Sequence, residues 1–244
     1  MSFAKAISWV CLFGWLVILG SLAHAVDYQW VGGSSTNPTG WHTATNWTPT
    51  GVPGVTDHAT IGENAIVTIS GDVNVAKLMM EANSTIQGTG NITVSQIFKA
   101  KDATLDGAGL LTFPSGCIVD FDSVLPTSAV NRNTKAKKRI KNRGNCHLNG
   151  GNLVLGAEFE NDIGGTFEIK TDGAITWSGV DKPRFKNRGK LVKSAGAAIS
   201  TITAPLENTG TIVAEFGTLD LGPSFTQIAG TTALNGGNIA SNSP

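Results

Sequence analysis

The feature that most constrains this chain is a short run of residues that returns about every twenty positions in its C-terminal half. An apolar residue is followed two places later by Asn or Gln, then by Gly, and then by a stretch of alternating polarity. Self-similarity at this period indicates a solenoid, in which each repeat buries its apolar side by stacking on its neighbours. The turn residues of the repeat are Asn142 and Gly144, Asn161 and Gly164, Asn187 and Gly189, and Asn208 and Gly210.

The repeat that begins at Leu206 shows how one unit folds. Asn208 tolerates left-handed backbone angles and Gly210 adopts them freely, so the two residues predict a tight turn. Short strands then follow on either side of Gly217. Two or three strands per repeat predict an all-β, right-handed parallel β-helix of roughly eight coils over residues 61–244, with Asn side chains hydrogen-bonded along its axis. A β-sandwich also has short strands, but it does not repeat one turn chemistry at a fixed offset.

Residues 1–25 have the form of a secretory signal peptide. Lys5 precedes an apolar stretch, and Ala23-His24-Ala25 is a small-x-small cleavage site, so we expect the processed chain to begin at Val26 or Asp27. The alternative is an uncleaved membrane anchor, which the cleavage site disfavours. We therefore predict a secreted or cell-surface protein without an integral membrane segment after cleavage.

Residues 26–60 differ from the repeats because they hold Trp30, Trp41 and Trp47 among Gly, Ser, Thr and Pro. The end of a solenoid exposes strand edges and apolar side chains, so it needs a cap. Large aromatic side chains folded over the first coil would provide one. The other interpretation is a carbohydrate-binding platform, because flat rings stack on sugars.

A family resemblance rests on this segment and on the repeats after it. The residues that carry it are Trp30, Gly32, Trp41, Asn46, Trp47, Gly51, Pro53, Asp57, Ala59 and Ile61. This pattern, followed by Val-rich repeats punctuated by Gly, resembles bacterial exported β-helix surface proteins. They include autotransporter-like passenger domains and planctomycete-type extracellular repeat proteins. The resemblance implies a fold and an extracellular location, and it implies no activity.

Two cysteines remain after signal cleavage, Cys117 and Cys146. Export permits a disulfide between them, which would close a loop of about 30 residues and stabilise the chain by up to roughly 3 to 4 kcal/mol. Cys146 also falls at a strand position that suits a small buried thiol. The sequence leaves both possibilities open.

Basic residues gather in one part of a chain whose overall charge is balanced, with 18 Lys and Arg against 18 Asp and Glu. We expect a basic loop near residues 123–145 that projects from one coil, and a second cluster on the same side of the rod. Such a patch is suited to a polyanion such as an acidic glycan, lipopolysaccharide or DNA, although basic runs are usually solvated surface. The candidates are Arg132, Lys135, Lys137, Lys138, Arg139, Lys141, Arg143, Lys186 and Arg188.

The rival hypothesis is an enzyme, because many parallel β-helix proteins are polysaccharide lyases or glycoside hydrolases. Asp120 and Asp122 flank Phe121 and would point to one face of a strand, as the carboxylates of such a site do. The alternative is the polar side of an amphipathic strand. We find no motif for a metal or cofactor. We therefore expect a structural or adhesive module without catalysis, either a monomer or part of a larger surface assembly.

Overall fold

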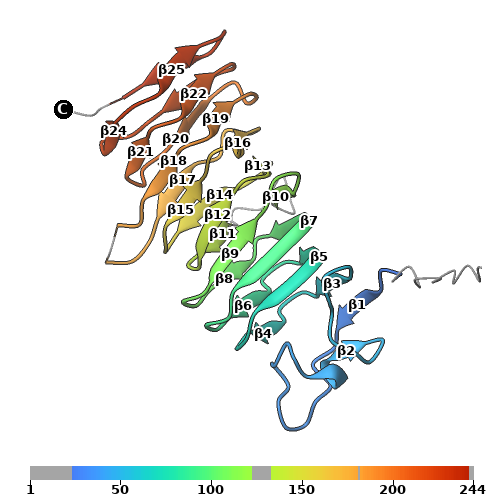
Figure 1. The fold of residues 1–244 in the computed structure, drawn as a ribbon. Coiled ribbons are helices and arrows are strands. Elements are labelled where there is room, and N and C mark those ends of the chain that lie inside the picture. Colours follow the sequence, from blue (N-terminus) through green and yellow to red (C-terminus); the bar gives the residue numbers. More distant parts are fainter. Residues whose placement is uncertain (1–23, 123–132, 181, 242–244) are drawn as a thin grey trace, which may run out of the picture.

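The computed structural model describes residues 24–122, 133–180 and 182–241, and it is a parallel β-solenoid of about eight turns. The strands of successive coils lie side by side along a rod, with the N-terminal cap at one end and β25 near the other (Figure 1). The predicted parallel β-helix is therefore confirmed. The expected signal peptide falls almost wholly on residues 1–23, outside the described residues.

Each coil contributes one strand to each of three ladders. The first ladder contains β3 (His58–Ile61), the ends of β5 (Val73–Met80) and β7 (Ile92–Lys101), β10 (Ile118–Asp122), β13 (Asn145–Leu148), β16 (Thr166–Ile169), β19 (Lys190–Lys193), β22 (Thr211–Ala214) and β25 (Thr231–Leu234). The second contains the starts of β5 and β7, then β9 (Leu110–Phe113), β12 (Arg139–Asn142), β15 (Phe159–Asn161), β18 (Phe185–Asn187), β21 (Leu206–Asn208) and β24 (Phe225–Gln227).

The third ladder changes sheet partway along the rod. Its first six strands are β4 (Ile66–Thr68), β6 (Thr85–Gln87), β8 (Thr104–Leu105), β11 (Asn133–Ala136), β14 (Asn152–Leu155) and β17 (Ile175–Trp177). A separate sheet then contains β20 (Ile199–Thr201), β23 (Thr218–Asp220) and β26 (Asn238–Ala240). A single bridge between Ile175 and Ile202 joins the two sheets. Every pairing in this ladder is parallel, as stacked coils require.

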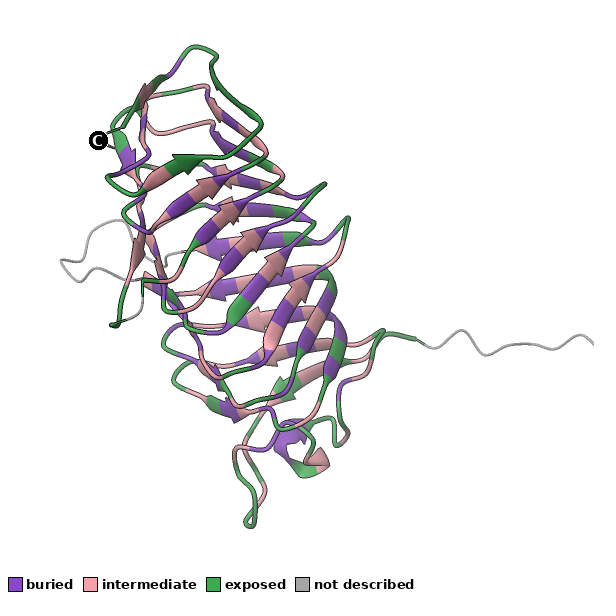
Figure 2. Cartoon of the chain, turned by 60° about the vertical axis from the view of Figure 1, so that its left-hand side comes forward, coloured by how far each residue is buried: buried purple, intermediate pink, exposed green. Residues whose placement is uncertain are grey.

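The core fills the inside of the rod with like side chains stacked on like. Strand residues alternate between buried and partly exposed positions, so each strand presents one face to the core (Figure 2). Phe159 and Phe185 pair in register and their rings stack with centroids 5.0 Å apart. Phe167 packs edge-on against both rings. Burying such rings is the main favourable term for each coil.

The Trp-rich segment packs on the first coil. β1 (Asp27–Trp30) pairs with β3 in parallel and with β2 (Trp47–Thr48) in antiparallel, and a short 3-10 helix (Ala44–Asn46) leads into β2. Trp41 and Trp47 are each only 1% exposed, and their rings meet edge-on at 4.7 Å. Trp30 packs edge-on against Trp47 at 4.9 Å. The faces of the two buried rings are closed to a sugar, which favours the capping interpretation.

The far end of the rod presents strands whose outer edges have no partner strand among the described residues. β24, β25 and β26 each pair only with the coil before them. Every residue of β25 is exposed, and Leu234 is 65% exposed. The sequence from residue 221 to 241 contains no charged side chain. The N-terminal coil is therefore covered by buried Trp side chains, whereas the last described strands are exposed.

The expected basic loop is wrong for the part that the structure describes. Residues 133–136 form β11 and residues 139–142 form β12, so they belong to the coil and do not project from it. The reason is that their polarity alternates in the strand period, with Thr134, Ala136 and Ile140 turned inward. Residues 123–132 lie outside the described residues.

Candidate functional site

A continuous row of buried amides runs along one corner of the C-terminal coils. The Nδ2 group of Asn142 donates to Oδ1 of Asn161 at 2.9 Å, and Asn161 donates in the same way to Asn187 at 2.8 Å. Asn187 donates to Asn208 at 2.7 Å. Asn208 donates to Oε1 of Gln227 at 3.0 Å. The four Asn residues are fully buried, so the predicted Asn ladder is confirmed.

The glycines of the same corner stack because the backbones approach too closely for a side chain. A Cβ atom on Gly189 would lie 2.1 Å from the oxygen of Gly165, and one on Gly210 would lie 2.2 Å from the oxygen of Gly189. Gly144 stacks on the oxygen of Cys117 in the same way. The stacked member of the second repeat is therefore Gly165, the residue after the expected turn residue Gly164. Gly164 lies in the turn with a φ of +84°, over open space.

Outside this corner, basic and acidic residues alternate from one coil to the next. Lys141, Glu160 and Lys186 are register partners on β12, β15 and β18. The prediction that Lys141 and Lys186 share one side of the rod is confirmed. The sequence reasoning missed the acidic residues between them, although Glu160 holds the repeat position of Lys141 and Lys186.

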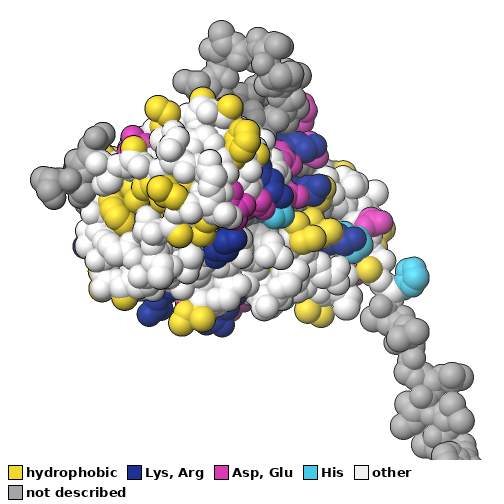
Figure 3. Space-filling model, turned by 90° about the horizontal axis from the view of Figure 1, so that it is seen from above, with side chains coloured by type: hydrophobic (Ala, Val, Ile, Leu, Met, Phe, Trp, Pro, Cys, Tyr) yellow, Lys and Arg dark blue, Asp and Glu magenta, His cyan; other side chains and the backbone are white. Residues whose placement is uncertain are grey.

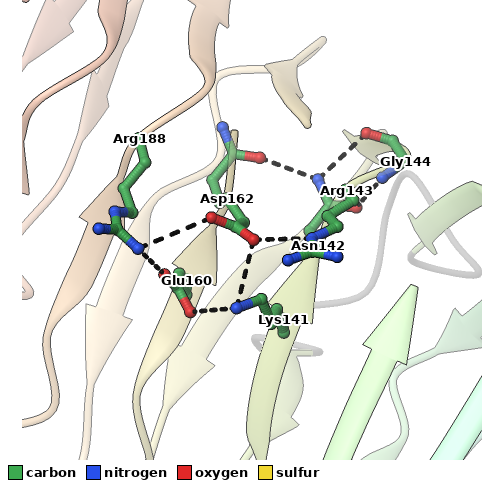
Figure 4. A network of polar contacts seen from close by, with 8 residues as sticks. Lys141, Asn142, Arg143, Gly144, Glu160, Asp162 and Arg188 are labelled. Carbon is green, nitrogen blue, oxygen red and sulfur yellow. Dashed lines mark hydrogen bonds and ion pairs between the residues drawn. The ribbon is translucent and has the colours of Figure 1, made fainter. Parts of the chain in front are cut away.

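The contacts in this row form one closed network (Figure 4). Lys141 Nζ lies 3.3 Å from a Glu160 carboxylate oxygen and 3.2 Å from an Asp162 one. Arg143 Nε donates to Asp162 at 2.7 Å, and Arg188 donates to Glu160 at 3.0 Å. Charges of opposite sign thus join three coils, and the carboxylates of Glu160 and Asp162 form ion pairs with the cations on either side.

Asp162 is the centre of the network, with a side chain only 6% exposed. Burial raises its pKa, but the hydrogen bonds from Arg143, from the backbone of Ile163 and from Lys141 together outweigh burial. The pKa of Asp162 therefore falls from 3.8 to about 2. The carboxylate stays charged and bound to its cations at any physiological pH.

The remaining cationic candidates fall into two groups. Lys186 lies 2.7 Å from Glu158, and Lys137 lies 3.3 Å from Asp106. Lys135 and Arg139 are exposed, and within the described part of the chain neither makes an ion pair. Figure 3 shows Lys and Arg side chains beside Asp and Glu on the face it views, without a separate patch of one sign. Arg132 lies outside the described residues.

The prediction that Lys138 belongs to the surface patch is wrong, because its side chain turns into the coil and is fully buried. Its Nζ group donates to the backbone oxygen of Gly88 at 3.0 Å. Burial lowers the pKa of Lys138, and the nearby Asp106 carboxylate opposes that shift. Lys138 therefore links coils from within the wall of the rod.

Asp120 and Asp122 point outward from β10, as the sequence predicts, and Asp120 is held by its neighbours. Its Oδ1 atom lies 2.9 Å from Nδ1 of His147, and its Oδ2 atom lies 3.6 Å from Lys99 Nζ. Asn149 donates to Asp120 at 3.2 Å and to Asp122 at 2.9 Å. The Asp120 side chain is 13% exposed. Like Asp162, Asp120 therefore contacts basic side chains of the neighbouring coils.

The row continues through His147 to Glu168, which lies 3.6 Å from His147 Nε2. Burial raises the pKa of Glu168, but the hydrogen bonds from Ser194 and Lys170 and the charges of Lys170 and His147 bring it below its ordinary value. Among the residues that the structure describes, no three His, Cys, Asp or Glu side chains are placed to hold a metal ion.

Cys117 and Cys146 are both buried and both free in the structure, so the disulfide that the sequence left open is not formed. Burial raises the pKa of the Cys117 thiol to about 12, against a smaller lowering by a backbone hydrogen bond. Burial also raises the pKa of Cys146, and the nearby Asp120 and Cys117 add to that shift. The two thiols therefore act as small apolar core residues.

The surface has shallow hollows near these rows. One, of about 220 Å³, is lined by Glu160, Lys186, Arg188, Glu207 and Thr209. Another, of about 550 Å³, lies over the last coils beside Arg184, Glu207 and Phe225. Asp120 and Asp122 line neither hollow.

Comparison with known proteins assigns no function to the chain. No protein-family model, curated protein or solved structure matches it. The β-solenoid fold therefore stands on the structure itself, and the resemblance to exported repeat proteins stays a prediction. In the described part of the chain, no helix has the length and apolarity needed to cross a lipid bilayer.

Proposed function

We propose that this chain is an exported, non-catalytic structural module, a rigid β-solenoid rod displayed outside the cell. The main support is that the polar side chains of the rod contact other coils of the same chain. The buried amides bond to the amides of the next coil, and the carboxylates of Asp120, Glu160 and Asp162 bind cations of neighbouring coils. Catalytic carboxylates must meet a substrate, whereas these meet the protein.

Support for export comes from the point at which the fold begins. β1 starts at Asp27, two residues after the small-x-small site that ends at Ala25. β1 pairs with β3, so the chain after that site is part of the folded body. Removal of residues 1–25 leaves the whole cap intact.

Export is tested by producing the full chain in a bacterium with a general secretion pathway. We expect the mass of the product to show loss of residues 1–25, and the processed chain to be found outside the cytoplasm. A chain that keeps its first 25 residues and stays in the cytoplasm would refute export. The matched control replaces Ala23 and Ala25 with Leu, which removes the cleavage site.

The absence of catalysis is tested separately, with turnover assays on a panel of acidic and neutral polysaccharides. We expect no product above the level of a heat-denatured sample. Sustained turnover that is lost in Asp120→Ala, while circular dichroism shows an unchanged fold, would establish the lyase or hydrolase alternative.

A second candidate function is adhesion to a polyanion, and the exposed pair Lys135 and Arg139 favours it. They flank one corner of the coil, and no described carboxylate neutralises them. A polyanion such as an acidic glycan, lipopolysaccharide or DNA would be held there by charge, so binding would weaken with salt.

The test for adhesion compares retention on heparin beads and on DNA beads. We expect Lys135→Glu with Arg139→Glu to abolish retention. Lys77→Glu with Lys182→Glu changes the net charge equally elsewhere on the rod and serves as the control. Equal loss in both variants would show that only bulk charge matters, and unchanged retention in the first would remove this site.

A further inference from the structure

The residue that follows the expected cleavage site is held by a carboxylate. The backbone nitrogen of Val26 donates to Oδ1 of Asp57 at 2.9 Å, and the oxygen of Val26 accepts from the nitrogen of His58 at 2.9 Å. The other carboxylate oxygen of Asp57 accepts from the nitrogen of Gly54 at 2.8 Å. Both ends of the Val26 residue are therefore fixed before β1 begins.

Asp57 also connects the cap to the body of the rod. Its backbone oxygen accepts hydrogen bonds from the nitrogens of Ala76 at 2.9 Å and Lys77 at 3.2 Å, in the middle of β5. One residue thus holds Val26, the Gly54 turn and β5 together. A change in how strongly Asp57 binds Val26 acts directly on the contact between cap and coils.

Cleavage changes the chemistry of that contact. Water adds across the peptide bond between Ala25 and Val26: its oxygen goes to the carbonyl carbon of Ala25, and the freed Val26 nitrogen gains protons. The neutral amide becomes an α-ammonium group with an ordinary pKa of about 7.7 to 8.0. The ammonium adds a full positive charge beside the Asp57 carboxylate, so Coulomb attraction is added to the hydrogen bond that the neutral amide makes.

We propose that Asp57 is the binding site for the amino terminus that leader removal creates, so that processing tightens the cap over the first coil. The inference rests on the proposed export. The site takes an α-ammonium group on residue 26, and a chain that begins one residue later has none there. The leader peptidase supplies only the hydrolysis, and Asp57 supplies the stabilisation.

The titratable neighbours along the chain are Asp27, which follows Val26, and His58, which follows Asp57. Asp27 extends outward with its side chain 80% exposed and contacts His58. Lys77 is the register partner of His58 in the next coil. The contacts of the Val26 nitrogen and of the Asp57 carboxylate thus involve backbone donors and each other.

The experiment is a cycle of four full-length chains, each exported and processed. They are the natural sequence, the same chain with Gly-Ser inserted after Ala25, and the Asp57→Asn variant of each. The insertion keeps the cleavage site but restores a neutral amide at Val26. Asp57→Asn removes the negative charge and one of the two acceptor oxygens in both backgrounds, so the comparison isolates the charge on Val26.

We expect Asp57→Asn to raise the equilibrium constant for unfolding about fivefold more in the natural chain than in the inserted chain at pH 7. The amine gains its partner on folding, so its pKa is raised above the unfolded value. This extra stability is present below about pH 8 and is lost as the pH rises through the raised pKa. Equal effects of Asp57→Asn in both chains would overturn the inference.

A second measurement needs no change at Asp57. The pH dependence of selective labelling at the α-amine gives its pKa in the processed natural chain and in the inserted chain. We expect a raised pKa for Val26 and an ordinary one for the inserted Gly. Equal values overturn the inference alone. A mass that shows a retained leader overturns the proposed export as well, so the two failures are distinguishable.

Discussion

Removing one amide from the middle of the Asn ladder is the most direct test of how the coils hold together. In Asn161→Ala the chain loses the bond accepted from Asn142 and those donated to Asn187 at 2.8 Å and to the oxygen of Lys190 at 3.0 Å. At about 1 kcal/mol for each bond, and with a buried acceptor left unpaired, the free energy of unfolding should fall by about 3 to 5 kcal/mol.

The matched control lies at the end of the same ladder. Gln227 is exposed and accepts from Asn208 at 3.0 Å, so water can replace it and Gln227→Ala should cost less than about 1 kcal/mol. Urea unfolding followed by circular dichroism gives both values by linear extrapolation. If the two substitutions cost the same, the buried amides do not join the coils as we argue.

Three further predictions follow from the same corner and from the core. Because the pKa of Asp162 is lowered to about 2, its charged form adds about 2 kcal/mol to the free energy of unfolding above pH 4. This contribution is lost as the pH falls toward 2. Asp162→Asn should therefore flatten the plot of unfolding free energy against pH between pH 4 and pH 2. Gly165→Ala places a Cβ atom 2.5 Å from a backbone oxygen and should cost about 1 to 3 kcal/mol, whereas Gly62→Ala meets open space and should be near neutral; calorimetry distinguishes them. Cys117 and Cys146 should resist a thiol reagent in the native chain and react on unfolding, and rapid native labelling of either would contradict their burial.

The fold could be predicted from the sequence because the repeat specifies it locally. Asn142, Asn187 and Asn208 each stand two residues before a glycine, and that spacing fixes a tight corner. Stacking then follows, because each coil can bury its apolar face only against the next. In the second repeat the corner holds two extra residues, so Gly164 lies in the turn as expected and the stacked position falls at Gly165.

The charged rows could be predicted only by comparing residues at the same repeat position, because clusters of charge along the chain do not show which charges face each other across coils. Lys141 and Lys186 are 45 positions apart, and Glu160 holds the same repeat position in the coil between them, as the register confirms. The sequence predicts Lys138 as part of the surface patch, but the structure buries it. Strand alternation turns it inward between Lys137 and Arg139, where a long side chain can reach a backbone oxygen two coils away.

The unlike ends of the rod give it a mechanical direction. At the capped end, a pulling force must first extract interlocked tryptophan rings. At the other end, β24, β25 and β26 each pair, among the described residues, with one strand of the preceding coil. Because each coil contacts only its neighbours, the loss of one coil exposes the core of the next. Within residues 24–241, we expect tension to detach β24, β25 and β26 before the strands next to the cap.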